Sequence, residues 1–147
     1  MRELSRPVLI ALCGACGAFA AACASYAPPP SHEAMAYELV GTHWVAASIN
    51  GAPVAGAAKP QISFSPEYQL SGSGGCNALF GVYEADNDHI DVRGLGHTQR
   101  ACAAPVMAQE TAFLGILKDA NRYDRDQGRL VITAEDGRSV TFESASG

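Results

Sequence analysis

Short runs of alternating apolar and polar residues constrain the fold of this chain more than any other feature. In Gln61–Ser65 the residues alternate between apolar and polar, and the same period of two recurs at His89–Arg93, Arg129–Ala134 and Ser139–Glu143. Strands with one face in a core have this pattern, so the chain is predicted to be mainly β. The predicted strands are Leu39–Ile49, Gln61–Ser65, Tyr68–Gly72, Ala78–Glu84, His89–Arg93, Gly96–Gln99, Arg122–Asp126, Arg129–Ala134 and Ser139–Glu143.

Turn-forming dipeptides separate these runs. Asn50-Gly51 and Asp136-Gly137 suit tight hairpins because their residues tolerate positive φ, and Asn87-Asp88 and Gln127-Gly128 are similar reversals. Short strands joined by tight turns favour an antiparallel meander of about eight or nine strands. We expect the meander to close into a small β-barrel, since closure removes exposed strand edges.

One segment, Pro105–Ala120, has the period of a helix instead. Its apolar residues at positions i, i+3, i+4 and i+7 are Phe113, Ile116, Leu117 and Ala120. Pro105 suits the first turn, where a missing N–H is tolerated. Glu110 in the N-terminal half and Lys118 in the last turn stand on the favourable sides of the helix dipole. The fold therefore has one predicted α-helix, at about residues 105–120.

The N-terminal region, residues 1–22, is predicted to be a signal peptide. Arg2 and Arg6 supply positive charge, and the uncharged run Pro7–Ala22 is too short for a comfortable transmembrane helix. We therefore expect export, and exclude this region from the fold.

The run ends in Ala20-Ala21-Ala22-Cys23, which is similar to a bacterial lipobox. Cys23 is the predicted lipidation site, and Ala24 after it is typical of retention at the outer membrane. Buried acyl chains such as palmitate would make a durable anchor. The prediction is an outer-membrane lipoprotein facing the periplasm; the alternative is ordinary cleavage that leaves a soluble periplasmic or secreted protein.

The segment 23–36 contains Pro28-Pro29-Pro30 and is predicted to be an extended tether. Residues 37–147 remain, which is enough for one domain with one core. The chain has a formal net charge of −5 and no block of Lys or Arg, so nucleic acid is an unexpected partner. We expect contact with the membrane only through the N-terminal lipid.

Two of the five cysteines, Cys76 and Cys102, lie within the predicted domain. The oxidising compartment favours a disulfide between them, which would stabilise the fold by about 3.5 kcal/mol on the chain-entropy model. Two alternatives stay open. Both cysteines could be free buried thiols, or Cys76 could be a catalytic thiolate with His89 or His97 as its base.

Other candidate sites in the domain are predicted to be structural. The glycine-rich run Ser71–Gly75 lacks the Lys of a phosphate loop and is interpreted as a strand bulge, with Asn77 bonded to its neighbouring backbone. The acidic segment Asp86–Asp91 lacks calcium-loop spacing and indicates a solvated hairpin tip. Trp44 is interpreted as a core aromatic. The histidines show no zinc-type spacing, so no metal and no cofactor is predicted.

Several motifs together carry a family resemblance. They are the opening Leu39-Val40-Gly41-Thr42-His43-Trp44, then Asn50-Gly51, Gly75-Cys76-Asn77, Phe80, Gly81, Tyr83, Thr98 four residues before Cys102, and Glu110 three residues before Phe113. This combination resembles the META/HslJ-like family of small bacterial envelope domains across essentially the whole domain. One departure is Arg100, where the family usually has an apolar residue.

The resemblance implies a small, mostly antiparallel barrel-like domain with one helix, linked to heat-shock or envelope-stress responses and to drug tolerance. It implies no catalytic residues. The expected function is therefore that of a non-enzymatic envelope lipoprotein contributing to stress or drug tolerance. The alternatives are a barrel that binds a small ligand and a module that binds a protein, in the manner of a protease inhibitor. The expected partners are an envelope protein or a small ligand.

Overall fold

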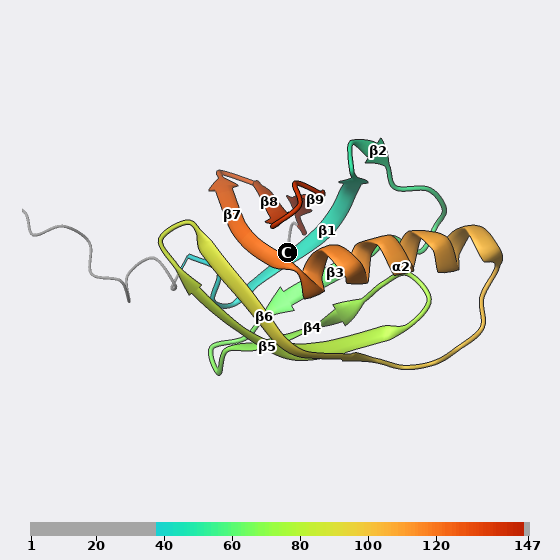
Figure 1. Ribbon diagram of the computed structural model, residues 1–147, viewed down its shortest axis with the longest axis horizontal. Coiled ribbons are helices and arrows are strands. Elements are labelled where there is room, and N and C mark those ends of the chain that lie inside the picture. Colours follow the sequence, from blue (N-terminus) through green and yellow to red (C-terminus); the bar gives the residue numbers. More distant parts are fainter. Residues whose placement is uncertain (1–37, 146–147) are drawn as a thin grey trace, which may run out of the picture.

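The computed structural model describes residues 38–145, which form nine strands and one α-helix (Figure 1). In chain order the elements are β1 (Thr42–Ile49), β2 (Ala52–Pro53), β3 (Gln61–Phe64), β4 (Gln69–Ser73), β5 (Ala78–Asp86), β6 (His89–His97), α2 (Ala104–Lys118), β7 (Ala120–Asp126), β8 (Arg129–Ala134) and β9 (Ser139–Ser144).

The strands close into an antiparallel barrel. β1 pairs with β3 on one side and with β9 on the other, so that eight strands form a closed ring. The short strand β2 is extra and pairs only with the end of β1. The prediction of a mainly β, barrel-like meander with one helix is confirmed.

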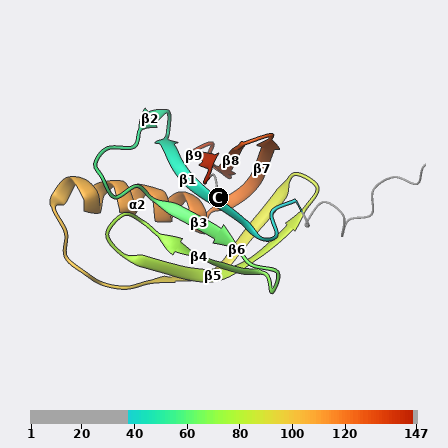
Figure 2. The same cartoon turned by 180° about the vertical axis from the view of Figure 1, so that it is seen from behind.

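The pairing between β6 and β7 is the shortest in the ring. One residue pair, His89 with Arg122, is in register there, and the Tyr123 N–H donates to the Asp88 carbonyl at 2.8 Å. The chain passes from β6 to β7 through α2, which covers one side of the barrel (Figures 1 and 2). The helix buries Phe113, Ile116 and Leu117 in the core.

Large apolar side chains occupy the interior of the barrel. The largest fully buried ones are Trp44, Tyr83, Phe64, Phe113, Phe142, Leu39, Ile62, Leu70, Ile90, Ile116, Leu117 and Leu130. Each contributes about 1.5–3 kcal/mol by leaving water. A ligand inside the barrel would have to displace these side chains.

The structure corrects two predicted boundaries around the helix and β6. The helix ends at Lys118, and Ala120, predicted on its apolar face, begins β7 opposite Ala134. Segments His89–Arg93 and Gly96–Gln99, predicted as two strands, form one strand up to His97. The strand continues because Gly94, at φ +59°, forms a bulge: it and the next residue oppose Gly81 of β5.

Two further differences lie near β1. The strand begins at Thr42 and not at Leu39, because the Thr42 N–H bonds back to the Leu39 carbonyl in a turn at 3.1 Å. The two-residue strand β2 was not predicted, since it is too short to show a period. The Asn50 turn before it has the positive φ expected, +50°.

The predicted signal peptide, the Cys23 lipidation site and the tether 23–36 lie outside the described residues. Within residues 38–145, no helix has the length and apolar character needed to span a membrane.

Candidate functional site

Cys76 and Cys102 are joined by a disulfide, with their Cα atoms 6.1 Å apart. The bond links the glycine-rich bend between β4 and β5 to the segment that leads into α2. Cys76 is 9% exposed, whereas Cys102 is at the surface. With its sulfur bonded to Cys102, Cys76 has no thiolate to offer as a nucleophile.

The carboxylate of Glu110 on α2 binds the same bend and is 2% exposed. Its Oε2 accepts the backbone N–H groups of Cys76 at 3.0 Å and Asn77 at 2.6 Å, and its Oε1 accepts the Asn77 side-chain amide at 2.6 Å. Successive backbone N–H groups in a bend form a concave anion site. Here the anion is supplied by the protein's own helix.

These contacts determine the protonation state of Glu110. Burial on its own raises the pKa of a carboxyl group, but the hydrogen bonds from Asn77 and Cys76, with a smaller contribution from the charge of His97, lower the pKa of Glu110 below its ordinary value. The group is therefore an anion at neutral pH, and hydrogen bonds replace the water that it loses.

The glycines of the bend make room for this carboxylate. A Cβ atom at Gly74 would lie 2.5 Å from Cγ of Glu110. Gly75 has φ +108°, which L side chains rarely adopt. The interpretation of Ser71–Gly75 as a strand bulge was wrong, because Ser71, Gly72 and Ser73 pair with both neighbouring strands without a shift in register. The donors to the carboxylate, Cys76 and Asn77, follow the run.

Asn77 is buried and holds the segment between β6 and α2. Its Oδ1 accepts the Thr98 hydroxyl at 2.8 Å and the Arg100 N–H at 2.6 Å, and its Nδ2 also donates to the Arg100 carbonyl at 3.3 Å. The prediction that Asn77 bonds its neighbouring backbone was wrong, since these partners are distant in sequence. Only backbone atoms of Arg100 take part, so this position accepts an arginine in place of an apolar residue.

Sequence reasoning placed Cys76, Asn77, Thr98 and Cys102 in one motif set, and the structure brings them together. It missed the burial of Glu110, which was interpreted through the helix dipole. A signal was present: Glu110 stands three residues before Phe113 and seven before Leu117, on the apolar face of the helix. A carboxylate at such a position needs donors, and the glycine bend supplies them.

The other motif residues lie apart from this network and make local contacts. Trp44 is 2% exposed, and its indole N–H donates to the Thr42 hydroxyl at 2.7 Å, close to the turn at Gly41. The Tyr83 hydroxyl donates to the Ser65 carbonyl at 3.1 Å, and Gly81 faces the β6 bulge. These contacts support structural roles.

The three histidines of the described chain, His43, His89 and His97, gather at no common point. His43 Nδ1 lies 2.7 Å from the Ser63 hydroxyl on the outside of the barrel, and His97 Nδ1 lies 2.7 Å from the Thr98 carbonyl. Among residues 38–145, no three His, Cys, Asp or Glu side chains are placed to hold a metal ion.

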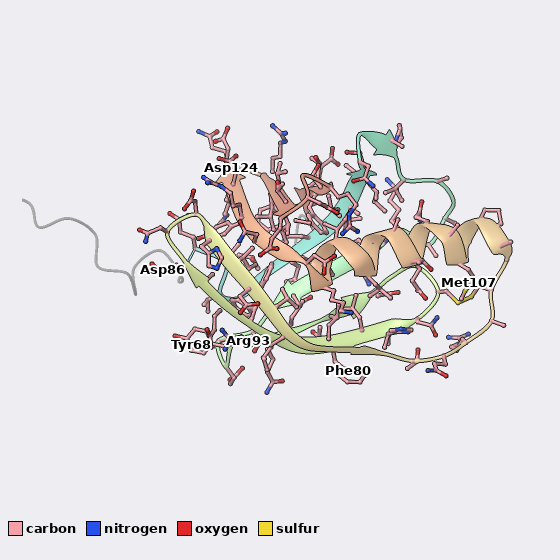
Figure 3. The ribbon with its side chains drawn as sticks, in the orientation of Figure 1. Tyr68, Phe80, Asp86, Arg93, Met107 and Asp124 are labelled. Atoms are coloured by element: carbon pink, nitrogen blue, oxygen red, sulfur yellow. A yellow bond between two sulfur atoms is a disulfide. The ribbon has the colours of Figure 1, made fainter. Side chains whose placement is uncertain are left out.

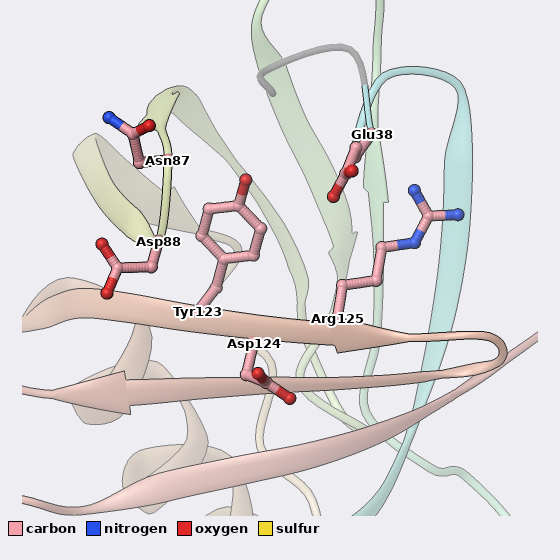
Figure 4. A pocket seen from close by; sticks show the side chains of 6 residues that line it. All are labelled: Glu38, Asn87, Asp88, Tyr123, Asp124 and Arg125. Carbon is pink, nitrogen blue, oxygen red and sulfur yellow. The ribbon is translucent and has the colours of Figure 1, made fainter. Parts of the chain in front are cut away.

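One open pocket of about 330 Å³ lies between the β5–β6 hairpin, β7 and the start of the described chain (Figure 4). Its lining residues are Glu38, Asn87, Asp88, Tyr123, Asp124 and Arg125. The Arg125 guanidinium lies 5.5 Å from the centre of the Trp44 ring, and Asp88 pairs with Arg122. The pocket therefore carries charges of both signs beside a buried tyrosine.

A second hollow, which we call the outer groove, lies on the outside of β4, β5 and β6 and has a volume of about 340 Å³. Its lining residues are Gln69, Leu70, Ser71, Phe80, Gly81, Val82, Arg93 and Gly94. Figure 3 shows Phe80 and Arg93 projecting on the same side of the barrel as Tyr68.

The protein is thus a small closed antiparallel barrel whose glycine bend is bound by a buried carboxylate of α2 and by a disulfide to the segment before α2. The chain belongs to the META domain family, whose model matches residues 37–147. The resemblance inferred from the motifs is confirmed.

Three solved structures are similar to this chain in fold. A protein from Burkholderia xenovorans, solved by NMR, is 27% identical, with a TM-score of 0.62 over 82% of this chain and 93% of that one. Another NMR structure is 28% identical, with a TM-score of 0.63 over 74% and 93%. A DUF4847 family protein from Bacteroides vulgatus shares the fold at 15% identity, with a TM-score of 0.56 over 73% and 94%. Comparison with curated proteins gave no match.

Proposed function

We propose that the protein is a lipid-anchored, non-enzymatic module of the bacterial envelope that contributes to tolerance of heat or drug stress. The observation that carries the proposal is the double tie between the glycine bend and α2. The tie uses the disulfide sulfurs of Cys76 and Cys102 and both carboxylate oxygens of Glu110. The sulfurs and the carboxylate are all engaged in contacts that hold the fold, which supports a non-enzymatic role.

The same tie suits a protein that works outside the cytoplasm. Disulfides persist in oxidising compartments, and a small domain locked in this way withstands unfolding where ATP-dependent chaperones are absent. The lipobox-like Ala20-Ala21-Ala22-Cys23 supports that location, and the stress role is taken from what the resemblance to the META/HslJ-like family implies.

The proposal has two separable tests in the native host. Labelling cells with an alkyne-bearing palmitate analogue should tag the wild type and fail to tag Cys23→Ser, which should leave the membrane fraction. A strain lacking the protein should grow less well under heat or antibiotic stress, and the wild-type gene should restore growth more fully than Cys23→Ser. Equal labelling of both forms would contradict the proposed lipid anchor. Unchanged growth of the strain lacking the protein would contradict the proposed stress role.

Binding of a small ligand is the second candidate function. The pocket in Figure 4 supports it, and a ligand would bind there because side chains fill the interior of the barrel. Its Arg125 and Glu38 would suit a zwitterionic molecule. Native mass spectrometry of protein purified from its host tests this candidate. A bound molecule that co-purifies with the wild type and is absent from Arg125→Ala would support ligand binding. A spectrum that shows only the mass of the ligand-free protein would contradict it.

A further inference from the structure

The outer groove exposes apolar side chains together. Phe80 and Val82 stand two residues apart on β5, and their exposed fractions are 57% and 47%. Both line the groove, and on a strand they project from the same face. Single exposed apolar residues are ordinary, but a pair that borders one hollow indicates a contact site.

The backbone and its neighbours hold the groove in shape. Phe80 is paired with Gly96 across β5 and β6, and a Cβ atom at position 96 would lie 2.6 Å from the Phe80 ring. The ring therefore rests on the glycine backbone while more than half of the side chain faces solvent. Gly81 and Gly94 line the groove without side chains, which leaves a space beside the ring. A groove formed in advance costs little entropy on binding.

The charges next to the groove favour a basic partner. The Arg93 guanidinium pairs with both oxygens of Glu84, at 3.0 and 2.9 Å, and through Nε with Asp91 at 2.7 Å. Glu84 and Asp91 do not line the groove; they are paired with each other across β5 and β6, next to the pair of Val82 and Arg93. Two carboxylates beside one guanidinium leave one net negative charge next to the groove. The whole chain is also acidic, at −5, so its field attracts basic segments.

We propose that the outer groove binds an extended segment of a partner protein that carries one large apolar side chain next to a lysine or arginine. The apolar side chain lies over Gly81 and Gly94, between Phe80 and Val82. The basic residue meets Glu84 and Asp91. The Gln69 and Ser71 side chains on β4 supply hydrogen bonds to the partner's backbone. The inference rests on the proposed function only in treating the domain as a binding module and not as an enzyme.

Selection from a random-peptide phage library against the purified, oxidised full chain tests this inference. Phe80→Ser and Val82→Ser remove the two apolar walls, and Tyr68→Ser is the matched control. Tyr68 is an aromatic residue of similar exposure, 50%, that does not line the groove. The melting temperature of each variant establishes that it is folded. We expect selected peptides to share an apolar residue beside a Lys or Arg.

A synthetic peptide of the selected sequence is then titrated into each protein. We expect roughly tenfold weaker binding to folded Phe80→Ser or Val82→Ser, a change within about twofold for Tyr68→Ser, and weaker binding in high salt. Three results would overturn the inference: no enriched motif, an acidic motif, or equal binding to the groove variants. A dimer in sedimentation that Phe80→Ser dissolves would also overturn it, because a second copy would then occupy the groove.

The two proposals fail in different ways. Unchanged growth of the deletion strain would contradict the stress role and would not affect the proposal of peptide binding. If no peptide is found whose binding depends on Phe80, the inference about the outer groove is contradicted, and the proposed stress role is unaffected.

Discussion

Asn77 donates two hydrogen bonds to Glu110, one from its backbone N–H and one from its side-chain amide, each at 2.6 Å. Through them the helix α2 holds the bend between β4 and β5. The disulfide between Cys76 and Cys102 joins the same bend to the residues just before α2. The bend is thus tied to the helical segment twice, once by charge and once covalently, and each tie can be removed separately.

Glu110→Gln tests the tie by charge. The amide has one acceptor oxygen where the carboxylate has two, so its NH₂ group must face a donor of Cys76 or Asn77. We expect the free energy of unfolding to fall by about 2–3 kcal/mol. Urea denaturation measures it, with the exposed Glu135→Gln as control, expected within about 0.5 kcal/mol of the wild type. Equal stability of the two variants would contradict the buried network.

Gly74→Ala tests the close approach of Glu110 to the bend. The added Cβ would lie 2.5 Å from Glu110 Cγ, so the helix or the bend must shift, at a cost of about 2 kcal/mol. Gly128→Ala is the matched control, since no neighbouring atom lies within 4 Å of a Cβ there. Thermal unfolding of both variants gives the comparison. Equal melting temperatures of Gly74→Ala and Gly128→Ala would mean that the Glu110 carboxylate does not lie against the bend.

Reduction of the disulfide tests the covalent tie. The closed loop spans a sequence separation of 26, and opening it should lower the free energy of unfolding by about 3.5 kcal/mol. Mass spectrometry should show a gain of two hydrogens on reduction. In the reduced native protein an alkylating reagent should reach the exposed Cys102 before the buried Cys76. Labelling of both thiols without prior reduction would show that the bond does not form.

Tyr83→Phe tests a buried phenol at alkaline pH. Burial, together with the nearby Tyr68, raises the pKa of Tyr83 from 10.0 to about 12. The folded state therefore binds this proton more tightly, and the stabilisation is complete below pH 10 and is lost as the pH rises towards 12. At neutral pH the free energy of unfolding of the variant should be lower by about 1 kcal/mol, because the hydrogen bond to Ser65 is lost. Above pH 10 it should fall less steeply with pH than that of the wild type, because the variant has no phenol to ionise. Parallel stability curves for the two proteins over that range would rule out the shift.

Much of the fold could be predicted because its rules are local. The alternation of Ile62 and Phe64, or of Val140 and Phe142, marks one buried face, and all four side chains are buried. Turn residues such as Asn50 and Asn87 have the positive φ expected of them. The end of the helix could not be predicted as well from the sequence, because Ala120 suits a helix as well as a strand. Only its pairing with Ala134 places it in a strand.

The site depended on contacts between distant residues. Gly75-Cys76-Asn77 could be recognised as a bend with one member of a cysteine pair, yet its partner Glu110 lies more than thirty residues away. Asn77 meets Arg100 for the same reason: tertiary packing brings the segment before α2 against the bend. The outer groove could not be predicted either, since it results from the β6 bulge that places Gly94 beside Gly81.

The pKa of the Glu110 carboxyl group, followed by its side-chain ¹³C shift in an NMR titration, tests the central claim most directly. The hydrogen bonds of the bend outweigh burial, so we predict a pKa below the ordinary value of 4.5. The matching stabilisation is complete above that value and is lost as the pH falls through the lowered pKa. A pKa above 4.5 would mean that burial dominates and that the bend does not hold an anion, which would contradict the account.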